Sequence, residues 1–149
     1  MDRRRFLVVA AGLAGANALP RPAGAAERLQ FSELYKGAGI LGLQISDKLR
    51  ALAGKPVEMA GFMAPPLKAE ARFFVLTREP LSLCPFCSSD ADWPADIVIV
   101  LLRDEIRFVQ SNQGIVVAGV LELGSKLDPQ TSFVSQIRLA DAEYRKLTS

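Results

Sequence analysis

Short runs of apolar residues, separated by turn-forming residues, recur along this chain and predict β-strands. Residues 57–63, 73–77, 96–102 and 115–123 are dominated by apolar side chains, and each run is too short for a buried helix to be favoured. Residues 133–139 alternate apolar and polar side chains, which is typical of a strand with one buried face. The pattern therefore predicts a mostly β domain built on these segments.

Glycines in the middle of two of these strands, Gly61 and Gly119, indicate how the sheet is shaped. A small barrel needs a glycine or a bulge where a strand turns a corner. Glycine also allows a second backbone to approach a strand closely. We expect a five-stranded OB-like Greek-key barrel with one or two short helices, and a β-sandwich is the alternative.

Helices are expected at two places. Residues 46–52 should form a short helix with Ser46 or Asp47 as its N-cap and Gly54 as its stop. A last helix over residues 140–147 should cap one end of the barrel.

Two other stretches give less definite predictions. Residues 29–43 look like an entry segment, and their glycines argue against a helix. Residues 105–112 fit either a strand or a short helix.

The first 25 residues fit an export signal. Arg3-Arg4-Arg5-Phe6-Leu7 matches the twin-arginine pattern, an apolar run follows over residues 8–19, and Ala23-Gly24-Ala25 fits the cleavage site. A transmembrane anchor is the alternative, but Gly, Asn and Pro interrupt a run shorter than the roughly 20 residues that a span needs. We expect a twin-arginine signal peptide at residues 1–25, a single domain at residues 26–149 and a periplasmic location.

The charge of the chain is nearly balanced. It carries 18 Lys and Arg residues against 16 Asp and Glu residues, and loss of residues 1–25 leaves 14 against 15, a net charge of −1. Such a domain has no basic surface of the kind that binds nucleic acid or an anionic membrane. We expect no nucleic-acid partner and no direct membrane insertion after the signal is removed.

Histidine is absent from the sequence. Its absence excludes the Ser-His and Cys-His pairs of nucleophilic catalysis. The chain also lacks a Gly-x-Ser-x-Gly elbow and a phosphate-cradling glycine loop. We expect a protein that is not an enzyme.

Both cysteines stand in one motif, Cys84-Pro85-Phe86-Cys87. A thioredoxin-like redox site requires a helix that begins at the first cysteine. Pro94 and the strand predicted from residue 96 leave no room for that helix, so a thiol-disulfide oxidoreductase is a disfavoured interpretation. A local disulfide is another, because exported proteins meet an oxidising compartment. Closing so short a loop contributes only about 2 kcal/mol, so the bond would shape the loop more than stabilise the domain.

Two thiolates at this spacing also suit a metal site. Cys84 and Cys87 would supply half of a tetrahedron, and Asp90, Asp92, water or a partner protein would complete it. Zinc or copper is the expected metal, since both accept thiolate ligands. A domain exported in the folded state could acquire its metal in the cytoplasm, where thiols stay reduced.

Four further side chains have both a functional and a structural interpretation. Met59 and Met63 could add thioether ligands for Cu(I), but packing in the core is favoured. Phe86 and Trp93 could form a partner-binding surface, whereas a single Trp beside a strand is more often part of the core.

Several short motifs together resemble a family of small exported bacterial proteins of unknown function. They are Gly61-Phe62-Met63, the Cys84-Pro85-Phe86-Cys87 loop, Val98-Ile99-Val100 and Val117-Ala118-Gly119-Val120-Leu121. The chain is also similar to the OB-like soluble part of permease-subunit proteins, in which a paired-cysteine loop precedes an Ala-Asp-Ala-like run, here Asp90-Ala91-Asp92. It departs from that type by having Cys-x-x-Cys in place of adjacent cysteines.

The resemblance covers roughly residues 55–139, and it implies association with ABC-type transporters, some of them linked to metal uptake. We therefore expect a periplasmic accessory or binding protein whose Cys-x-x-Cys loop holds a metal, with an ABC transporter or another membrane protein as partner. A structural or adaptor domain with a local disulfide is the alternative.

Overall fold

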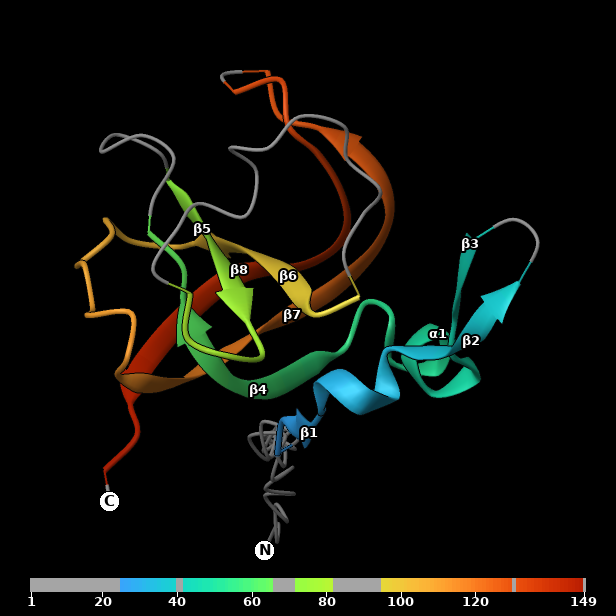
Figure 1. The fold of residues 1–149 in the computed structure, drawn as a ribbon, viewed down its shortest axis with the longest axis horizontal. Helices are drawn as coiled ribbons and strands as arrows, with labels where there is room; N and C mark the ends of the chain where they lie inside the picture. The colour runs from blue at the N-terminus through green and yellow to red at the C-terminus, as the bar shows by residue number, and fades with distance from the viewer. Residues whose placement is uncertain (1–24, 40–41, 66–71, 82–94, 130, 149) are drawn as a thin grey trace, which may run out of the picture.

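A computed structural model describes residues 25–39, 42–65, 72–81, 95–129 and 131–148 of the chain, and most of them lie in strands (Figure 1). The strands are β1 (Glu27–Arg28), β2 (Tyr35–Gly39), β3 (Gly42–Ile45), β4 (Pro56–Met63), β5 (Phe73–Thr77), β6 (Ile97–Leu102), β7 (Gly114–Leu127) and β8 (Val134–Lys146). The helical elements are a 3-10 helix, η1 (Phe31–Glu33), and an α-helix, α1 (Asp47–Leu52).

Strands β4 to β8 close into a barrel. Hydrogen bonds join them in the order β4-β5-β6-β8-β7, and β7 pairs back with β4. Each of these pairs is antiparallel except β6 with β8, which is parallel. In chain order the ring therefore runs first, second, third, fifth, fourth, which is the arrangement of an OB barrel. The mostly β prediction is confirmed, and β1 adds a short parallel pair to β4.

The two glycines singled out in the sequence lie where backbones meet. β4 pairs with β7 up to Phe62 and with β5 from Phe62 onward, so the strand changes neighbour beside Gly61. A Cβ at Gly61 would lie 2.6 Å from the carbonyl oxygen of Thr77. Gly119 occupies a register shift of the β7–β8 pair, where a Cβ would lie 3.0 Å from the carbonyl oxygen of Ala140. Both glycines thus allow the close approach that closes the barrel.

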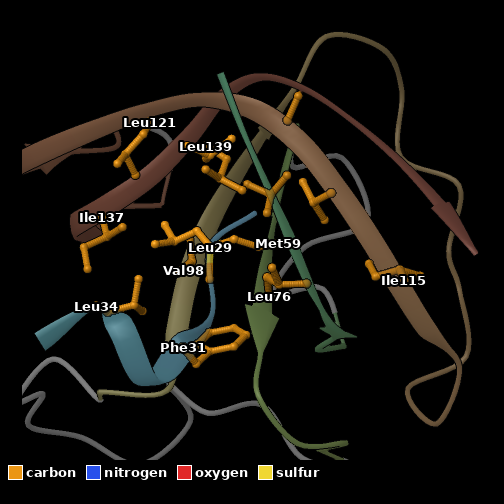
Figure 2. Close-up of a cluster of buried hydrophobic side chains, with 14 of the residues drawn as sticks. Leu29, Phe31, Leu34, Met59, Leu76, Val98, Ile115, Leu121, Ile137 and Leu139 are labelled. Carbon is orange, nitrogen blue, oxygen red and sulfur yellow. The ribbon is translucent and has the colours of Figure 1, made fainter. Parts of the chain in front are cut away.

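Alternate residues of the barrel strands point inward and form the main core. Phe74 and Leu76 of β5, and Ile137 and Leu139 of β8, are almost completely buried. The N-terminal segment packs on the same cluster (Figure 2). Its contributing side chains are Leu29, Phe31, Leu34, Leu49 and Leu52. In this chain η1 and α1 therefore supply apolar cover for the barrel interior.

The predicted helix at residues 46–52 is confirmed as α1. Ser46 is the N-cap, and its hydroxyl oxygen accepts a hydrogen bond from the Leu49 amide at 3.0 Å. Gly54 follows the helix with φ 77°, in the left-handed region that favours glycine, and its amide donates to the Leu121 carbonyl at 2.7 Å.

The helix predicted over residues 140–147 is wrong, because β8 continues to Lys146. Ala, Glu, Arg and Lys in this stretch favour a helix locally. These residues form a strand instead, because the strand pairs with β7 as far as Ile115↔Lys146 and buries Ala142 in the core. Residues 105–112, for which a strand or helix was expected, form neither.

The entry segment at residues 29–43 contains an antiparallel hairpin of β2 and β3. The hairpin stands away from the barrel (Figure 1), and its pairing forms a separate two-stranded sheet. Among the described residues, no helix is long and apolar enough to cross a membrane.

Candidate functional site: a groove on the outer face of β5 and β6

The cysteine motif and its neighbours lie outside the described residues. This applies to all six predicted site residues, Cys84, Phe86, Cys87, Asp90, Asp92 and Trp93. The ends of the connection that carries them are fixed, since Thr77 pairs with Ile97 and the Arg78 amide donates to the Asp96 carbonyl at 3.2 Å. The motif is therefore inserted at one end of the β5–β6 hairpin.

The described part of the chain contains no group of three or more Cys, Asp and Glu side chains that could hold a metal. Met59 and Met63 are fully buried in the main core. Packing, the favoured interpretation of these two thioethers, is thereby confirmed.

The outer face of the barrel carries a row of side chains that crosses four strands. Val75 of β5 pairs with Ile99 of β6, Ile99 with Arg138 of β8, and Arg138 with Glu122 of β7. Directly paired residues project from the same face of a sheet. The face is consequently apolar on β5 and β6 and charged on β8 and β7.

The apolar half of this face is buried although it points away from the barrel interior. Val75, Ile97 and Ile99 are each at most 4% exposed and form a second cluster with Ala64 and Phe73. Phe133, the last residue of the β7–β8 connection, packs on the cluster and stacks on Phe73 with ring centroids 6.3 Å apart.

A groove of about 200 Å³ lies where the two halves meet, and we call it the outer groove. Its lining residues are Phe73, Ile99, Leu101, Lys126, Leu127, Asp128, Pro129, Phe133, Ser135 and Arg138. Ligands of OB folds bind on this face, over the second and third strands and beside the connection between the fourth and fifth. In this chain those elements are β5, β6 and residues 128–133.

Arg138 is the buried cation of the outer groove, with a side chain only 6% exposed. Its Nε donates to Glu122 Oε2 at 3.2 Å. Its Nη1 donates to the Gly124 carbonyl at 2.7 Å and to the carbonyl and hydroxyl oxygens of Ser135, both at 3.0 Å. These bonds fix the guanidinium plane between the ends of β7 and β8.

Hydrogen bonds among Asp128, Thr131, Ser132 and Phe133 hold one wall of the groove together. The Asp128 amide donates to the Phe133 carbonyl at 2.8 Å, and the Ser132 amide donates to the Asp128 carbonyl at 2.8 Å. The Asp128 carboxylate accepts hydrogen bonds from the amide and the hydroxyl of Thr131. Such an arrangement stabilises a turn locally, and it holds Phe133 over Phe73.

Two exposed ion pairs shift pKa values elsewhere on the molecule. The hydrogen bond from Lys48, 2.7 Å away, and that from the Gln30 amide lower the pKa of Glu33. The bidentate hydrogen bonds from Arg103, each 2.8 Å long, lower the pKa of Asp141. Both pairs lie on the surface, and none of their four residues lines the outer groove.

Other hollows are larger than the outer groove but lack a deeply buried charged side chain in their lining. One of about 400 Å³ lies beside β1 and β4, with Arg28, Glu58 and Arg78 in its lining. Another of about 570 Å³ lies between residues 102–109 and the end of β8. Neither has a charged side chain as deeply buried as Arg138 among its lining residues.

Sequence reasoning missed the outer groove. Arg138 was only a polar partner in the alternating strand at residues 133–139. The available signal was a charged residue in the middle of a strand whose neighbours are Ile137 and Leu139, because such a charge requires partners when it is buried.

An OB-like barrel with an apolar, partly charged groove on its outer face defines the class of this protein. No family model matches the chain. It resembles the solved structure of a DUF3299 family protein from Pseudomonas aeruginosa PAO1, with a TM-score of 0.52, 17% identity, and coverage of 85% of this chain and 99% of that chain. The similarity shows a shared fold with a protein of a family of unknown function.

A curated relative matches at the level of sequence. The chain is 33% identical over 113 residues to the DNA primase small subunit PriS of Pyrococcus horikoshii. The match covers 65% of this chain and 33% of that protein, so the chain spans about a third of the length of this relative.

Proposed function

We propose that the chain is a periplasmic, non-enzymatic binding protein that receives its ligand in the outer groove. The observation that carries the proposal is the position of the groove, on the face and beside the connection that OB folds use for ligands. A stacked pair of aromatic rings, Phe73 and Phe133, lies at its apolar end. Rigid aromatic walls bind a ligand at low entropic cost.

The charged groups of the groove favour binding over catalysis. Glu122 is engaged by Arg138 and by Lys126, whose Nζ lies 3.9 Å away. The carboxylate of Asp128 is engaged by Thr131. A general base needs an accessible lone pair aimed at a substrate proton, and these carboxylates instead hold the walls of the groove in place.

The size of the groove indicates a small ligand or one end of a longer one. A volume of about 200 Å³ is below the roughly 300–1,000 Å³ of sites for drug-sized molecules. One or two fused rings would fill it.

The match to a primase subunit raises single-stranded nucleic acid as another ligand, and OB folds include proteins that bind it. The ion pairs argue against this ligand, because both cations of the groove, Arg138 and Lys126, already pair with the Glu122 carboxylate. Nucleic-acid affinity comes largely from unbalanced positive charge along the phosphate backbone.

The binding experiment uses 2-naphthoate as the small-ligand probe and an eight-residue oligothymidylate as the nucleic-acid probe, both titrated into the purified protein. We expect saturable binding of 2-naphthoate that is weakened in Leu127→Ser, since Leu127 lines the groove and is 58% exposed. Leu43→Ser on β3 is the matched control, because Leu43 is an exposed leucine that does not line the groove. Saturable binding of the oligothymidylate alone, or equal losses in both variants, would contradict the proposal.

We also propose that Cys84 and Cys87 bind zinc or copper, with Asp90, Asp92 or a partner group completing the site. The support is the insertion of the motif at the end of the same β5–β6 hairpin that forms the groove floor. Metal analysis of protein purified under reducing conditions should find about one thiolate-bound ion per chain, lost in Cys84→Ser with Cys87→Ser. Metal-free protein that fails to take up added zinc or copper, or a Cys84–Cys87 disulfide in protein from the periplasm, would favour the adaptor alternative.

The proposed partner remains an ABC-type transporter or another membrane protein, with Phe86 and Trp93 in the contact surface. Replacing both with alanine should then weaken co-purification with such a membrane protein from membranes of the native cell, while leaving 2-naphthoate binding unchanged.

A further inference from the structure

The guanidinium of Arg138 has an unused hydrogen-bonding end. Its hydrogen bonds within the described residues employ Nε and Nη1, and none employs Nη2. No buried side-chain nitrogen or oxygen there is left without a partner, so Nη2 is not sealed inside the protein. Arg138 lines the outer groove with a side chain that is only 6% exposed, so the small accessible part of its guanidinium is available to a ligand in this groove.

An unsatisfied guanidinium nitrogen in such a place is suited to an anion. Nη2 carries two N–H groups that can donate to carboxylate oxygens, and charge-assisted hydrogen bonds of this kind are about twice as strong as neutral ones. The surrounding bonds to Gly124 and Ser135 already hold the guanidinium in one orientation. A ligand would therefore not have to order the arginine side chain.

The charge balance of the groove selects among anions. Both cations of the groove, Arg138 and Lys126, pair with the carboxylate of Glu122, which lies beside the lining, and Asp128 is the carboxylate within the lining. A single negative charge adjacent to Nη2 meets a cation with little repulsion, whereas a dianionic phosphate would meet the two carboxylates as well. The apolar end, with Ile99, Leu101 and the Phe73–Phe133 stack, then accepts a hydrophobic body.

We infer that the outer groove binds monocarboxylates with an aromatic or other compact apolar body, whose carboxylate is held by Nη2 of Arg138. This inference rests on the proposed function, since it names the ligand class of the same groove. Phe73 and Phe133 flank the apolar body, and Lys126, which is 57% exposed, lies at the polar mouth.

The test compares two ligands of nearly the same shape, the anion 2-naphthoate and the neutral 2-naphthamide, by calorimetry on the full purified protein. We expect the carboxylate to bind about tenfold or more tightly at low ionic strength, as a charge-assisted hydrogen bond implies. Arg138→Lys, which keeps the positive charge but loses Nη2, should reduce this preference to less than about threefold. Arg145→Lys, on the same strand but outside the groove, is the matched control and should preserve it.

The outcomes separate the two proposals. Equal binding of both ligands overturns the carboxylate inference and leaves the groove as a binding site, whereas binding of neither overturns both. A preference that survives in folded Arg138→Lys also overturns the role of Nη2.

If Arg138→Lys does not fold, the nitrogen-15 NMR signals of the Arg138 guanidinium in the unmodified protein test whether the carboxylate contacts it. They should shift when 2-naphthoate is added and stay in place when 2-naphthamide is added. Signals that do not respond to the carboxylate contradict the inference.

Discussion

Two single residues in this protein, Gly61 and Arg138, have structural roles that depend on their residue type. Gly61 marks the barrel corner, and Arg138 ties β7 to β8 below the groove. Gly61 was singled out in the sequence because glycine inside an apolar strand has few explanations. Arg138 was not, because its partners Glu122, Gly124 and Ser135 come from segments that only the barrel brings together.

Substitution of Gly61 by alanine should destabilise the barrel. The new Cβ would lie 2.6 Å from a backbone carbonyl oxygen, which cannot move without breaking the β4–β5 pairing. We expect a loss of about 1–3 kcal/mol in the free energy of unfolding, as for other overpacked positions. Urea unfolding followed by circular dichroism measures it.

Gly114→Ala is the matched control for that substitution. A Cβ there meets only the side chain of Leu147, an exposed and flexible group, at 3.0 Å. Its effect should stay within about 0.5 kcal/mol, as for ordinary surface changes. Equal effects of the two substitutions would contradict the role assigned to the barrel corner.

The ion pair of Glu33 and Lys48 should make stability depend on pH. The hydrogen bonds from Lys48 and the Gln30 amide lower the pKa of Glu33 in the folded state below its ordinary value of 4.5. The contribution of this carboxylate to stability is therefore present above pH 4.5 and is lost as the pH falls through the lower pKa of the folded state. The effect is small, since both side chains are about a third exposed or more.

The measurement compares the urea midpoints of the unmodified protein and Glu33→Gln between about pH 3 and pH 7, a range that spans the titration of a carboxylate. The unmodified protein should be the more stable near neutral pH, and the two should converge in acid. Glu79→Gln, at an exposed position for which the described residues show no ion pair, should give no such convergence. A difference between the unmodified protein and Glu33→Gln that is constant over the whole range would refute this assignment.

At the scale of elements, the residues within and next to a segment predicted its bounds correctly where the segment is short. The N-cap of α1, the stop at Gly54 and the bounds of β5 followed from neighbouring residues alone. β8 did not, because its last residues favour a helix locally and become a strand only through pairing with β7. Long-range pairing of this kind leaves little trace in a single sequence.

Ser46 connects two of these elements. Its hydroxyl caps α1 through the Leu49 amide and donates to the Glu33 carbonyl of η1 at 2.6 Å. Ser46→Ala should lower the free energy of unfolding by about 1–2 kcal/mol, because it removes a cap and leaves a carbonyl without its donor. Ser46→Thr, which keeps the hydroxyl, should restore most of the loss, and a thermal melt of both variants shows whether it does. A Thr variant as unstable as the Ala variant would exclude the hydroxyl as the cause.

At the scale of the whole molecule, the described residues divide into a closed barrel and a projecting hairpin. The sequence predicted the strands of the barrel better than those of the hairpin. Apolar runs predicted the barrel strands β4 to β7, since each run is one buried strand, and the second half of β8 is the part of the barrel that was missed. The glycine-rich residues 29–43 gave no definite element. The cysteine motif, the most conspicuous chemistry in the sequence, lies outside the described residues, and its metal role stays a prediction.

Hydrogen exchange should reveal the same division. The β2–β3 sheet is separate from the barrel sheet in the described structure, and an isolated two-stranded hairpin is marginally stable in water. Amides of β2 and β3 should therefore exchange much faster than those of β4 and β7, measured by exchange-quenched mass spectrometry. Similar protection in both regions would show that further contacts hold the hairpin against the barrel.

The central claim is that the outer groove binds the ligand, and mapping of amide NMR signals tests it most directly. Titration of the purified protein with 2-naphthoate should shift the signals of β5, β6 and residues 126–138, and leave those of β2, β3 and α1 unchanged. Shifts that cluster at another surface, or no saturable shift at all, would contradict the account.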